Sequence, residues 1–171
     1  FPTRRSSDLF IQALADNTPR PHGRWDEWIG ECNEREVARD TEIAEQAKLP
    51  ATEYINPLLL CTHIEKMMSE DSVMVVDGGD FVATAAYICK PRSPLSWLDP
   101  GVFGTLGVGG GFAVGAALCR PEAETWIIWG DGSAAYSLAE FDTCVRHGLS
   151  VIAVVGTDAS WQQIAREQVD M

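Results

Sequence analysis

The sequence predicts an α/β fold in which a parallel sheet has helices on both faces. Three segments are apolar and rich in Val or Ile: SVMVVDGGD at 72–80, TWIIW at 125–129 and VIAVVG at 151–156. None of them alternates apolar and polar residues, so each reads as a strand that is covered on both faces. Helical patterns separate the segments, as is typical of parallel sheets.

The helices around these strands are predicted in chain order. Asn56-Pro57 opens the first, because Asn is a favoured helix cap and Pro fits the first helical position. The apolar residues of this helix share a face that can pack on a sheet: Leu58, Leu59, Cys61, Ile64 and Met67. A second helix is predicted over 81–88, and a third over SLAEFDTCVRHG at 137–148.

Three parts of the chain differ in composition. Residues 1–9, FPTRRSSDL, match the translation of a common sequencing-library adapter and lack the apolar stretch of a signal peptide, so they are excluded from fold prediction. Residues 10–50 are polar with a helical pattern, and are interpreted as the end of a preceding middle domain and a linker. Residues 51–171 are the main predicted domain. We expect this fold to be incomplete at both ends, with its C-terminus truncated.

Charge and cysteine content exclude some functions. The net charge is −12, or −13 without Arg4, Arg5 and Asp8, and so acidic a chain is a poor nucleic-acid binder. The five cysteines form no CxxC pair and no zinc-site spacing, which favours reduced thiols in a reducing compartment. No Asn-x-Ser/Thr glycosylation acceptor is present.

One charge-free segment, GVFGTLGVGGGFAVGAALC at 101–119, is long enough to cross a bilayer. Its seven glycines make a poor free-standing helix, however, and Asp99-Pro100 and Arg120-Pro121 flank it. The interpretation we favour is a loop that leads into a short buried helix. No membrane-spanning segment is therefore expected here.

The ends of the predicted strands carry the residues suited to chemistry. Open parallel sheets bind ligands at the carboxyl edge, where Asp77-Gly78-Gly79-Asp80, Gly130-Asp131-Gly132-Ser133 and Thr157-Asp158 would meet. Asp131 and Asp158 are 27 positions apart, the length of one helix and one strand. Two carboxylates with further oxygen ligands suit Mg²⁺, which also binds phosphate oxygens. Neither G-x-G-x-x-G nor G-x-x-x-x-G-K-S/T occurs in the chain.

The motif at these strand ends resembles that of a known family. Gly-Asp-Gly at 130–132, followed by Thr-Asp at 157–158, is similar to the diphosphate-binding motif of thiamine-diphosphate-dependent enzymes, which usually ends in Asn-Asn. VVDGGDFVATAAYI and WLDPGVFGTLGVGGGFAVGAAL extend the resemblance over nearly all of 56–171. It implies the thiamine-diphosphate-binding fold, in the C-terminal domain of such an enzyme, with thiamine diphosphate and Mg²⁺ as cofactors.

The resemblance implies a role for each matching position. Asp131 and Asp158 would bind Mg²⁺ with the Ser160 carbonyl, and Thr157 is the alternative to Asp158. Gly132 and Ser133 would donate N–H groups to the diphosphate. The implied cofactor-binding residues are Asp80, Phe81, Gly104, Thr105, Leu106, Gly130, Asp131, Gly132, Ser133, Asp158, Ser160 and Trp161. Leu106 would hold the cofactor in its bent shape, and Trp161 and Gln162 would lie near the substrate entrance.

The same resemblance sets expectations for catalysis. In this family a glutamate on another domain activates the cofactor, so we expect no catalytic residue in this chain and no activity from it alone. Glu140 and Glu167 are rejected as substitutes. The favoured reaction is cleavage of a 2-hydroxyacyl-CoA to an aldehyde and formyl-CoA. The alternatives are acetolactate synthesis from a 2-keto acid, and a non-catalytic module of the same fold.

The resemblance also implies how the full-length protein assembles and where it is located. The full-length protein is expected to be a homodimer or homotetramer, with the segment 101–119 partly against the partner subunit. It is expected at the endoplasmic reticulum membrane, held by an anchor outside these residues. The unpaired cysteines and absent glycosylation acceptors would place this domain on the cytosolic side, and a cytoplasmic protein is the alternative.

Overall fold

The structure is a computed structural model that describes residues 2–18, 23–51, 54–161, 164–165 and 168. Contacts divide the chain into two compact units, Phe1–Thr41 and Glu42–Met171. The first holds helix α1 (Pro2–Asn17) and the larger part of helix α2 (Asp26–Ala47). α1 includes residues 2–9, and the adapter origin of the segment 1–9 stays a prediction.

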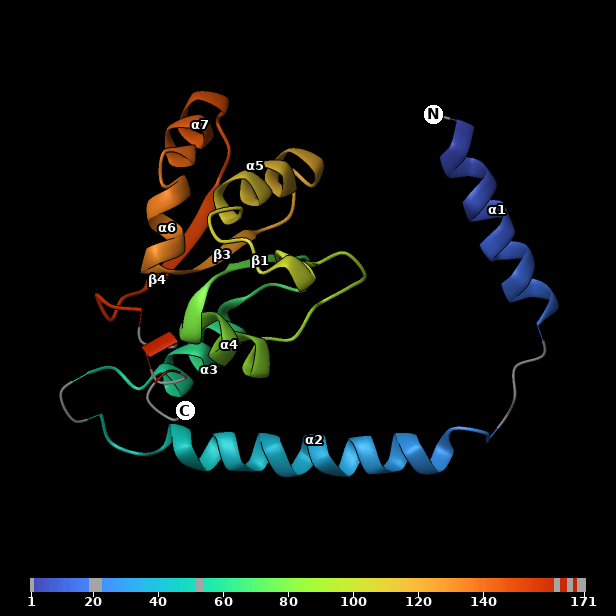
Figure 1. Ribbon diagram of the computed structural model, residues 1–171, viewed down its shortest axis with the longest axis horizontal. Coiled ribbons are helices and arrows are strands. Elements are labelled where there is room, and N and C mark those ends of the chain that lie inside the picture. The colour runs from blue at the N-terminus through green and yellow to red at the C-terminus, as the bar shows by residue number, and fades with distance from the viewer. Residues whose placement is uncertain (1, 19–22, 52–53, 162–163, 166–167, 169–171) are drawn as a thin grey trace. The chain divides into compact units, whose positions relative to one another are not determined.

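The second unit is built on one parallel sheet of four strands in the order β2-β1-β3-β4 (Figure 1). Three are the predicted strands, β1 (Val73–Asp77), β3 (Thr125–Gly130) and β4 (Val151–Gly156). β1 and β3 lie next to each other at the centre and are almost wholly buried. The predicted parallel sheet is confirmed.

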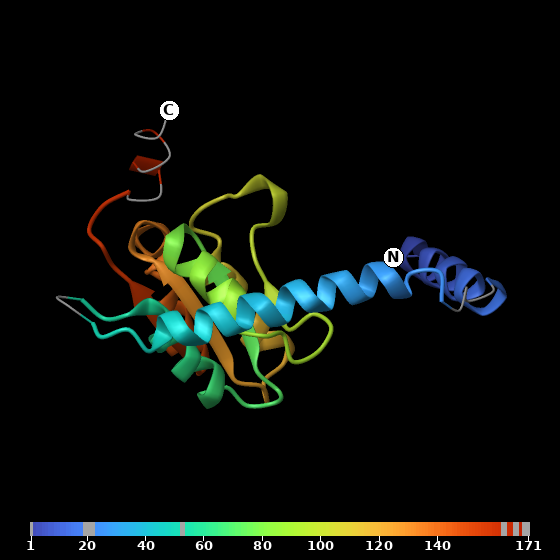
Figure 2. The same ribbon diagram turned by 90° about the horizontal axis from the view of Figure 1, so that it is seen from below.

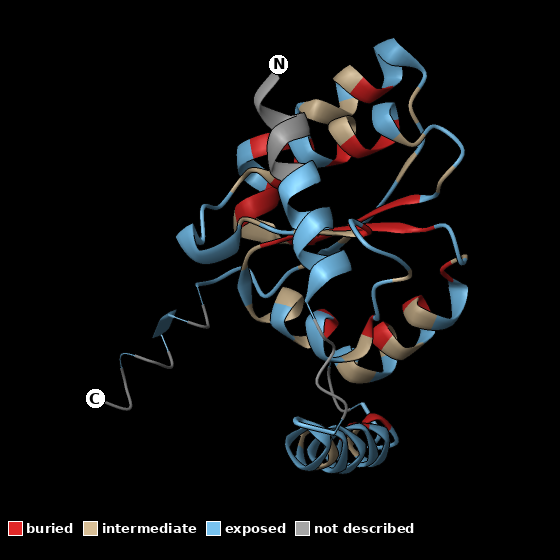
Figure 3. Ribbon diagram, turned by 90° about the vertical axis from the view of Figure 1, so that its right-hand side faces the viewer, coloured by how far each residue is buried: buried red, intermediate tan, exposed pale blue. Residues whose placement is uncertain are grey.

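Helices cover both faces of this sheet, as Figures 1 and 2 show. On one face lie α3 (Pro57–Met67) and α4 (Gly79–Ile88), and on the other lie α5 (Gly109–Cys119), α6 (Asp131–Ser137) and α7 (Glu140–His147). The sheet therefore separates two apolar clusters, and buried residues lie on the strands and the inward faces of the helices (Figure 3). The first cluster is centred on Met74 and Ile128, and the second on Ile127 and Trp129. Each such side chain contributes about 1.5–3 kcal/mol on burial.

Local sequence explains where several helices begin and end. The side chain of Asn56 accepts hydrogen bonds from the Leu58 and Leu59 N–H groups at 3.0 and 3.4 Å, which caps α3. Its amide also donates to the Gln46 carbonyl at 3.0 Å and so fastens the end of α2 to α3. α7 ends at Gly148, whose φ of 63° is left-handed and favours glycine.

Three elements differ from the sequence prediction. Strand β2 (Trp97–Leu98) was not predicted, since it has only two residues and prolines on both sides. The predicted helix over 137–148 is divided: Ser137 is the last residue of α6, which begins at Asp131, and residues 140–147 form α7. The two are joined by a tighter turn in which the Phe141 N–H donates to the Leu138 carbonyl at 3.2 Å. α4 begins at Gly79, two residues before the predicted start.

The charge-free segment 101–119 forms a single 3-10 turn, η1 (Gly101–Phe103), then a loop and α5. The predicted loop and short helix are confirmed. α5 is only 11 residues long. In the part of the chain that the structure describes, no helix combines the length and apolar character needed to cross a bilayer.

Candidate functional site

The carboxyl ends of the three long strands lie at one edge of the sheet because of their register. Asp77 pairs with Trp129, and Gly130 pairs with Gly156. The turns that leave these strands therefore start side by side. The sequence prediction that 77–80, 130–133 and 157–158 meet at one edge is confirmed by this pairing.

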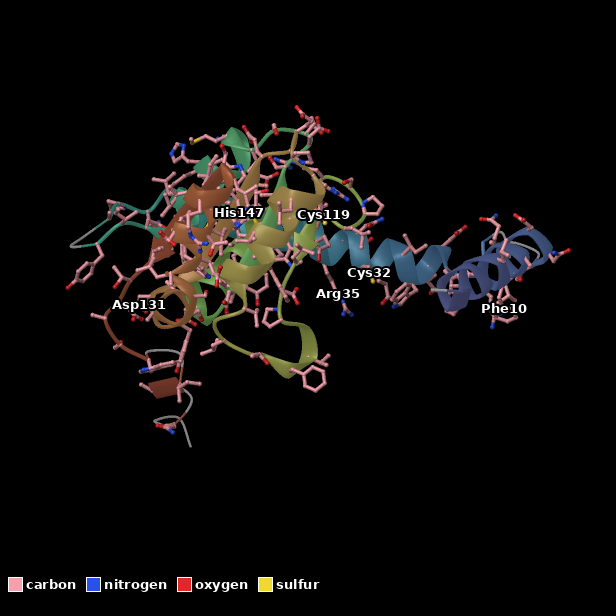
Figure 4. All side chains as sticks on the ribbon, turned by 90° about the horizontal axis from the view of Figure 1, so that it is seen from above. Phe10, Cys32, Arg35, Cys119, Asp131 and His147 are labelled. Carbon is pink, nitrogen blue, oxygen red and sulfur yellow. The ribbon has the colours of Figure 1, made fainter. Side chains whose placement is uncertain are left out.

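Asp131 is the central carboxylate of this edge. It is the first residue of α6, immediately after β3, and Figure 4 shows it well away from the exposed His147 at the end of α7. Its Oδ2 accepts hydrogen bonds from the Thr157 hydroxyl at 2.9 Å and the Ala159 N–H at 3.1 Å. Its Oδ1 accepts from the Gly132 N–H at 2.8 Å. One carboxylate thus joins the turn after β3 to the loop after β4.

These hydrogen bonds also set the charge of Asp131. The Thr157 hydroxyl is the largest cause that lowers the pKa of this carboxyl, partial burial opposes it, and the Gly132 and Ala159 N–H groups lower it further. The side chain is therefore anionic at neutral pH, as a cation ligand must be.

Of the two candidate partners in the loop after β4, Thr157 is the one that contacts Asp131. Asp158 is exposed, and its Oδ1 accepts from the Ser160 N–H at 2.9 Å within its own loop. Ser160 is exposed as well. Among the described residues, no three Asp, Glu, His or Cys side chains gather at one point.

Glycines make room for the backbone at this edge. A Cβ at Gly130 would lie 2.6 Å from the Gly78 carbonyl oxygen, and a Cβ at Gly78 would overlap the Ser133 hydroxyl. Gly78 also has a φ of 77°, which favours glycine. The β1 and β3 turns consequently approach each other more closely than residues with side chains would allow.

The side chains of Leu106 and Ser133 both lie where a side chain of residue 78 would be. A Cβ at Gly78 would come within 2.9 Å of both the Leu106 Cδ2 and the Ser133 Cβ. Ser133 is buried, whereas 37% of Leu106 is exposed. The structure thus brings together three segments that are far apart in the sequence.

The remaining predicted site residues lie around these groups. Phe81 is half-buried, and a Cβ at Gly156 would lie 2.5 Å from its ring. Asp80 is half-buried in the first turn of α4, and Gly104 and Thr105 are exposed. The Trp161 ring lies against Gly132, where an added Cβ would be 3.3 Å from it. Gln162 and the rejected Glu167 lie outside the described residues.

Two polar groups at this edge were not predicted to bind the Gly-rich loop. The Asp77 carboxylate accepts from the Gly109 N–H at 2.7 Å and the Gly107 N–H at 3.0 Å. The Ser137 hydroxyl accepts from the Gly110 N–H at 3.2 Å. The sequence signal for Asp77 was an acidic residue that closes an otherwise apolar strand.

The oxygen atoms of this edge are of the kind that binds a divalent cation. Asp131, Asp158, Thr157 and Ser160 offer only oxygen, the ligand type that Mg²⁺ prefers. At Gly78, Gly130 and Gly132 the place of a Cβ is taken by Ser133, the Gly78 carbonyl and the Trp161 ring, so these glycines allow the turns to pack closely around Asp131.

Comparison with known proteins identifies the family. The profile described as "Thiamine pyrophosphate enzyme, C-terminal TPP binding domain" matches residues 77–171, more than half of the chain. The chain belongs to this family. The matched region of this TPP-binding domain begins at Asp77 and includes every predicted site residue.

Curated relatives of this TPP-binding domain carry two kinds of name. It is 56% identical over 147 residues to "2-hydroxyacyl-CoA lyase 2" of Xenopus laevis, covering 85% of this chain and 23% of the relative. The lyase of the same name in Homo sapiens is 52% identical over 143 residues, covering 84% and 23%. An acetolactate synthase large subunit of Mycobacterium tuberculosis is 33% identical over 153 residues, covering 88% and 27%. The chain therefore spans about a quarter of the length of these relatives.

Proposed function

We propose that this domain binds thiamine diphosphate together with Mg²⁺, within a carbon–carbon lyase that cleaves a 2-hydroxyacyl-CoA to an aldehyde and formyl-CoA. One observation carries the binding proposal: Asp131 stands at the β3–α6 turn and accepts hydrogen bonds from the loop after β4. The identity of 52–56% to lyases, against 33% to an acetolactate synthase, supports the choice of reaction.

The metal end of the site would be formed by the turns after β3 and β4. Asp131 and Asp158 would supply carboxylate oxygens, with the Ser160 carbonyl, and Thr157 would orient Asp131 through its hydroxyl. The cation would then neutralise both the carboxylates and the diphosphate. Gly132 and Ser133 would face the diphosphate, and the Gly132 N–H, which is bonded to Asp131 in this structure, would have to change partner.

The other end of the site would be formed by the Gly-rich loop and the start of α4. Gly104 and Leu106 would meet the aminopyrimidine through their backbone, with Thr105 between them, and Leu106 would also hold the cofactor in its bent shape. Asp80 and Phe81 would lie beside the far end of the diphosphate, and Trp161 near the substrate entrance. When bound, the cofactor supplies a thiazolium carbon that adds to a substrate carbonyl and takes up the electrons of the breaking bond.

No residue of this chain is proposed as the catalytic acid or base. The glutamate that activates the cofactor would come from another domain of the full-length protein, supplied by a partner subunit. The part of this chain is to bind and orient the cofactor and to keep water away from it.

The metal requirement is testable by calorimetry on full-length protein. We predict that thiamine diphosphate binds in the presence of Mg²⁺ and shows no measurable binding in EDTA, because two carboxylates and a diphosphate repel one another without a cation. Titration of the cofactor with and without Mg²⁺ measures this directly. Equal affinity under both conditions would reject the proposed site.

The reaction is testable with purified full-length protein, Mg²⁺ and cofactor. We expect an aldehyde to form from a long-chain 2-hydroxyacyl-CoA and no acetolactate from pyruvate. Acetolactate without aldehyde would instead favour a synthase, and neither product would favour a non-catalytic module.

We further propose that the full-length protein resides at the endoplasmic reticulum membrane with this domain on the cytosolic side. The membrane is proposed from the resemblance described above. The cytosolic side is supported by the five unpaired cysteines and the lack of glycosylation acceptors in the sequence. Protease treatment of intact microsomes should digest this domain. Its protection until detergent is added would contradict the proposal.

A further inference from the structure

A buried carboxylate attaches the Gly-rich loop, residues 104–109, to the sheet. Asp77 ends β1, and none of its surface is exposed. Its Oδ2 accepts from the Gly109 N–H at 2.7 Å and the Gly107 N–H at 3.0 Å. Its Oδ1 lies 3.2 Å from the same Gly107 nitrogen.

The loop can reach this carboxylate only because both donors are glycines. Gly107 has a φ of 89°, a conformation that residues with a Cβ rarely adopt. A Cβ at Gly109 would lie 2.8 Å from the Asp77 Cβ and would overlap the Trp129 indole nitrogen. The sequence of the loop is thus matched to the acidic side chain beneath it.

The η1 turn that leads into this loop has little support from burial. Val102 is 100% exposed and Phe103 is 88% exposed, and this segment (yellow) projects from the domain in Figure 2. Leu106 lies between this exposed part and Gly107, with its Cδ2 beside Gly78. The hydrogen bonds from Gly107 and Gly109 to Asp77 therefore fix where Leu106 and Gly104 lie relative to the sheet.

We propose that Asp77 is a positioning residue for the thiamine half of the cofactor. It acts through the loop that carries Gly104 and Leu106, and it does not touch the diphosphate or the metal. This inference rests on the proposed function for the identity of the ligand. The attachment of the loop to Asp77 can be tested without any ligand.

The test compares the full-length protein with its Asp77→Asn and Ser137→Ala variants. Asn keeps the shape of Asp77 but removes the charge and one acceptor. Ser137→Ala is the matched control, because Ser137 is also buried and accepts an N–H from the neighbouring Gly110. Calorimetry with Mg²⁺ uses two probes, thiamine diphosphate and inorganic pyrophosphate. Amide hydrogen exchange follows Gly107 and Gly109 without ligand.

For Asp77→Asn we expect the affinity for thiamine diphosphate to fall about tenfold or more, and the affinity for pyrophosphate to change less than about twofold. Gly107 and Gly109 should exchange faster. Ser137→Ala should leave both affinities and both exchange rates unchanged.

Two results would overturn the inference: unchanged affinity for thiamine diphosphate in Asp77→Asn, or an equal loss for both probes, which would indicate general destabilisation. If the unsubstituted full-length protein binds neither probe, the proposed function fails instead. Exchange at Gly107 and Gly109 then still decides whether Asp77 fixes the loop, and unchanged rates would refute it.

Discussion

Asp131 and Glu140 provide a contrast at the scale of single residues. Both are acidic and follow β3, but Asp131 stands at the β3–α6 turn with three hydrogen bonds, whereas Glu140 starts α7. We predict that Asp131→Ala lowers the affinity for Mg²⁺ and thiamine diphosphate by on the order of 100-fold, because it removes a charged metal ligand. Glu140→Ala should change it little. Calorimetry on both variants checks this, and a large loss in the Glu140 variant alone would contradict the site.

The buried thiols allow a prediction about pH. Burial raises the pKa of Cys61 to about 11 and, with the neighbouring Cys61 and Glu65 adding to it, that of Cys89 to about 12. Because the pKa of each thiol is higher in the folded protein, its contribution to stability is fully present when the pH is below the ordinary thiol pKa of about 9. This contribution is lost as the pH rises toward 12. The free energy of unfolding should therefore fall over this range, as measured by denaturant titration at several pH values. Cys61→Ala with Cys89→Ala should flatten the fall.

The same thiols should be unreactive in the folded protein. Cys61, Cys89 and Cys144 are buried, whereas Cys119 is exposed and Cys32 is half-buried. A thiol reagent at neutral pH should therefore modify two cysteines quickly and the other three only after denaturation, since the thiolate is the reacting form. Rapid modification of all five would contradict the packing of α3 and α4 on the sheet.

At the scale of elements, the glycines of the β1 and β3 turns differ from Gly111 and Gly115 of α5, which have open space around them. We predict that Gly130→Ala destabilises the domain by about 1–3 kcal/mol, because its Cβ would press on the Gly78 carbonyl, a backbone atom that cannot turn away. Gly111→Ala is the control. Its Cβ would meet nothing within 4 Å, so it should stabilise α5 by about 0.5–1 kcal/mol. Denaturant unfolding of both variants measures the difference, and equal effects would contradict the close approach of the two turns.

Elements with a strong local signal were predictable from the sequence. The apolar segments that became β1, β3 and β4 and the Asn56-Pro57 start of α3 are examples. Strand β2 was not, because two residues exist as a strand only through their pairing with Met74 and Val75. At the site, the meeting of the strand ends followed from topology. The hydrogen bonds from the Gly107 and Gly109 N–H groups to Asp77 could not be predicted in this way, because they join residues that are 30 or more positions apart in the sequence.

At the scale of the whole molecule, the exposed apolar residues of η1 suggest a partner subunit. We predict that the full-length protein is an obligate dimer and that Phe103→Asp weakens it, because Phe103 is exposed on a charge-free segment. Val145→Asp is the control, as Val145 is similarly exposed on α7. Sedimentation at micromolar concentration measures the dimer. A fully active, monodisperse monomer would contradict this prediction.

The all-parallel sheet also affects the rate at which the chain folds. The two central strands join Val73 to Thr125, so the chain must close a loop of 52 residues before any central pair of strands gains a hydrogen bond. The free-energy cost of that lost entropy is offset only after the strands have paired. Such topologies therefore fold slowly compared with helical bundles. Helices α3 to α5 can form early, yet the rate of refolding is expected to follow the β1–β3 encounter. Substitutions in these two strands should therefore slow refolding more than substitutions on the outer surfaces of the helices.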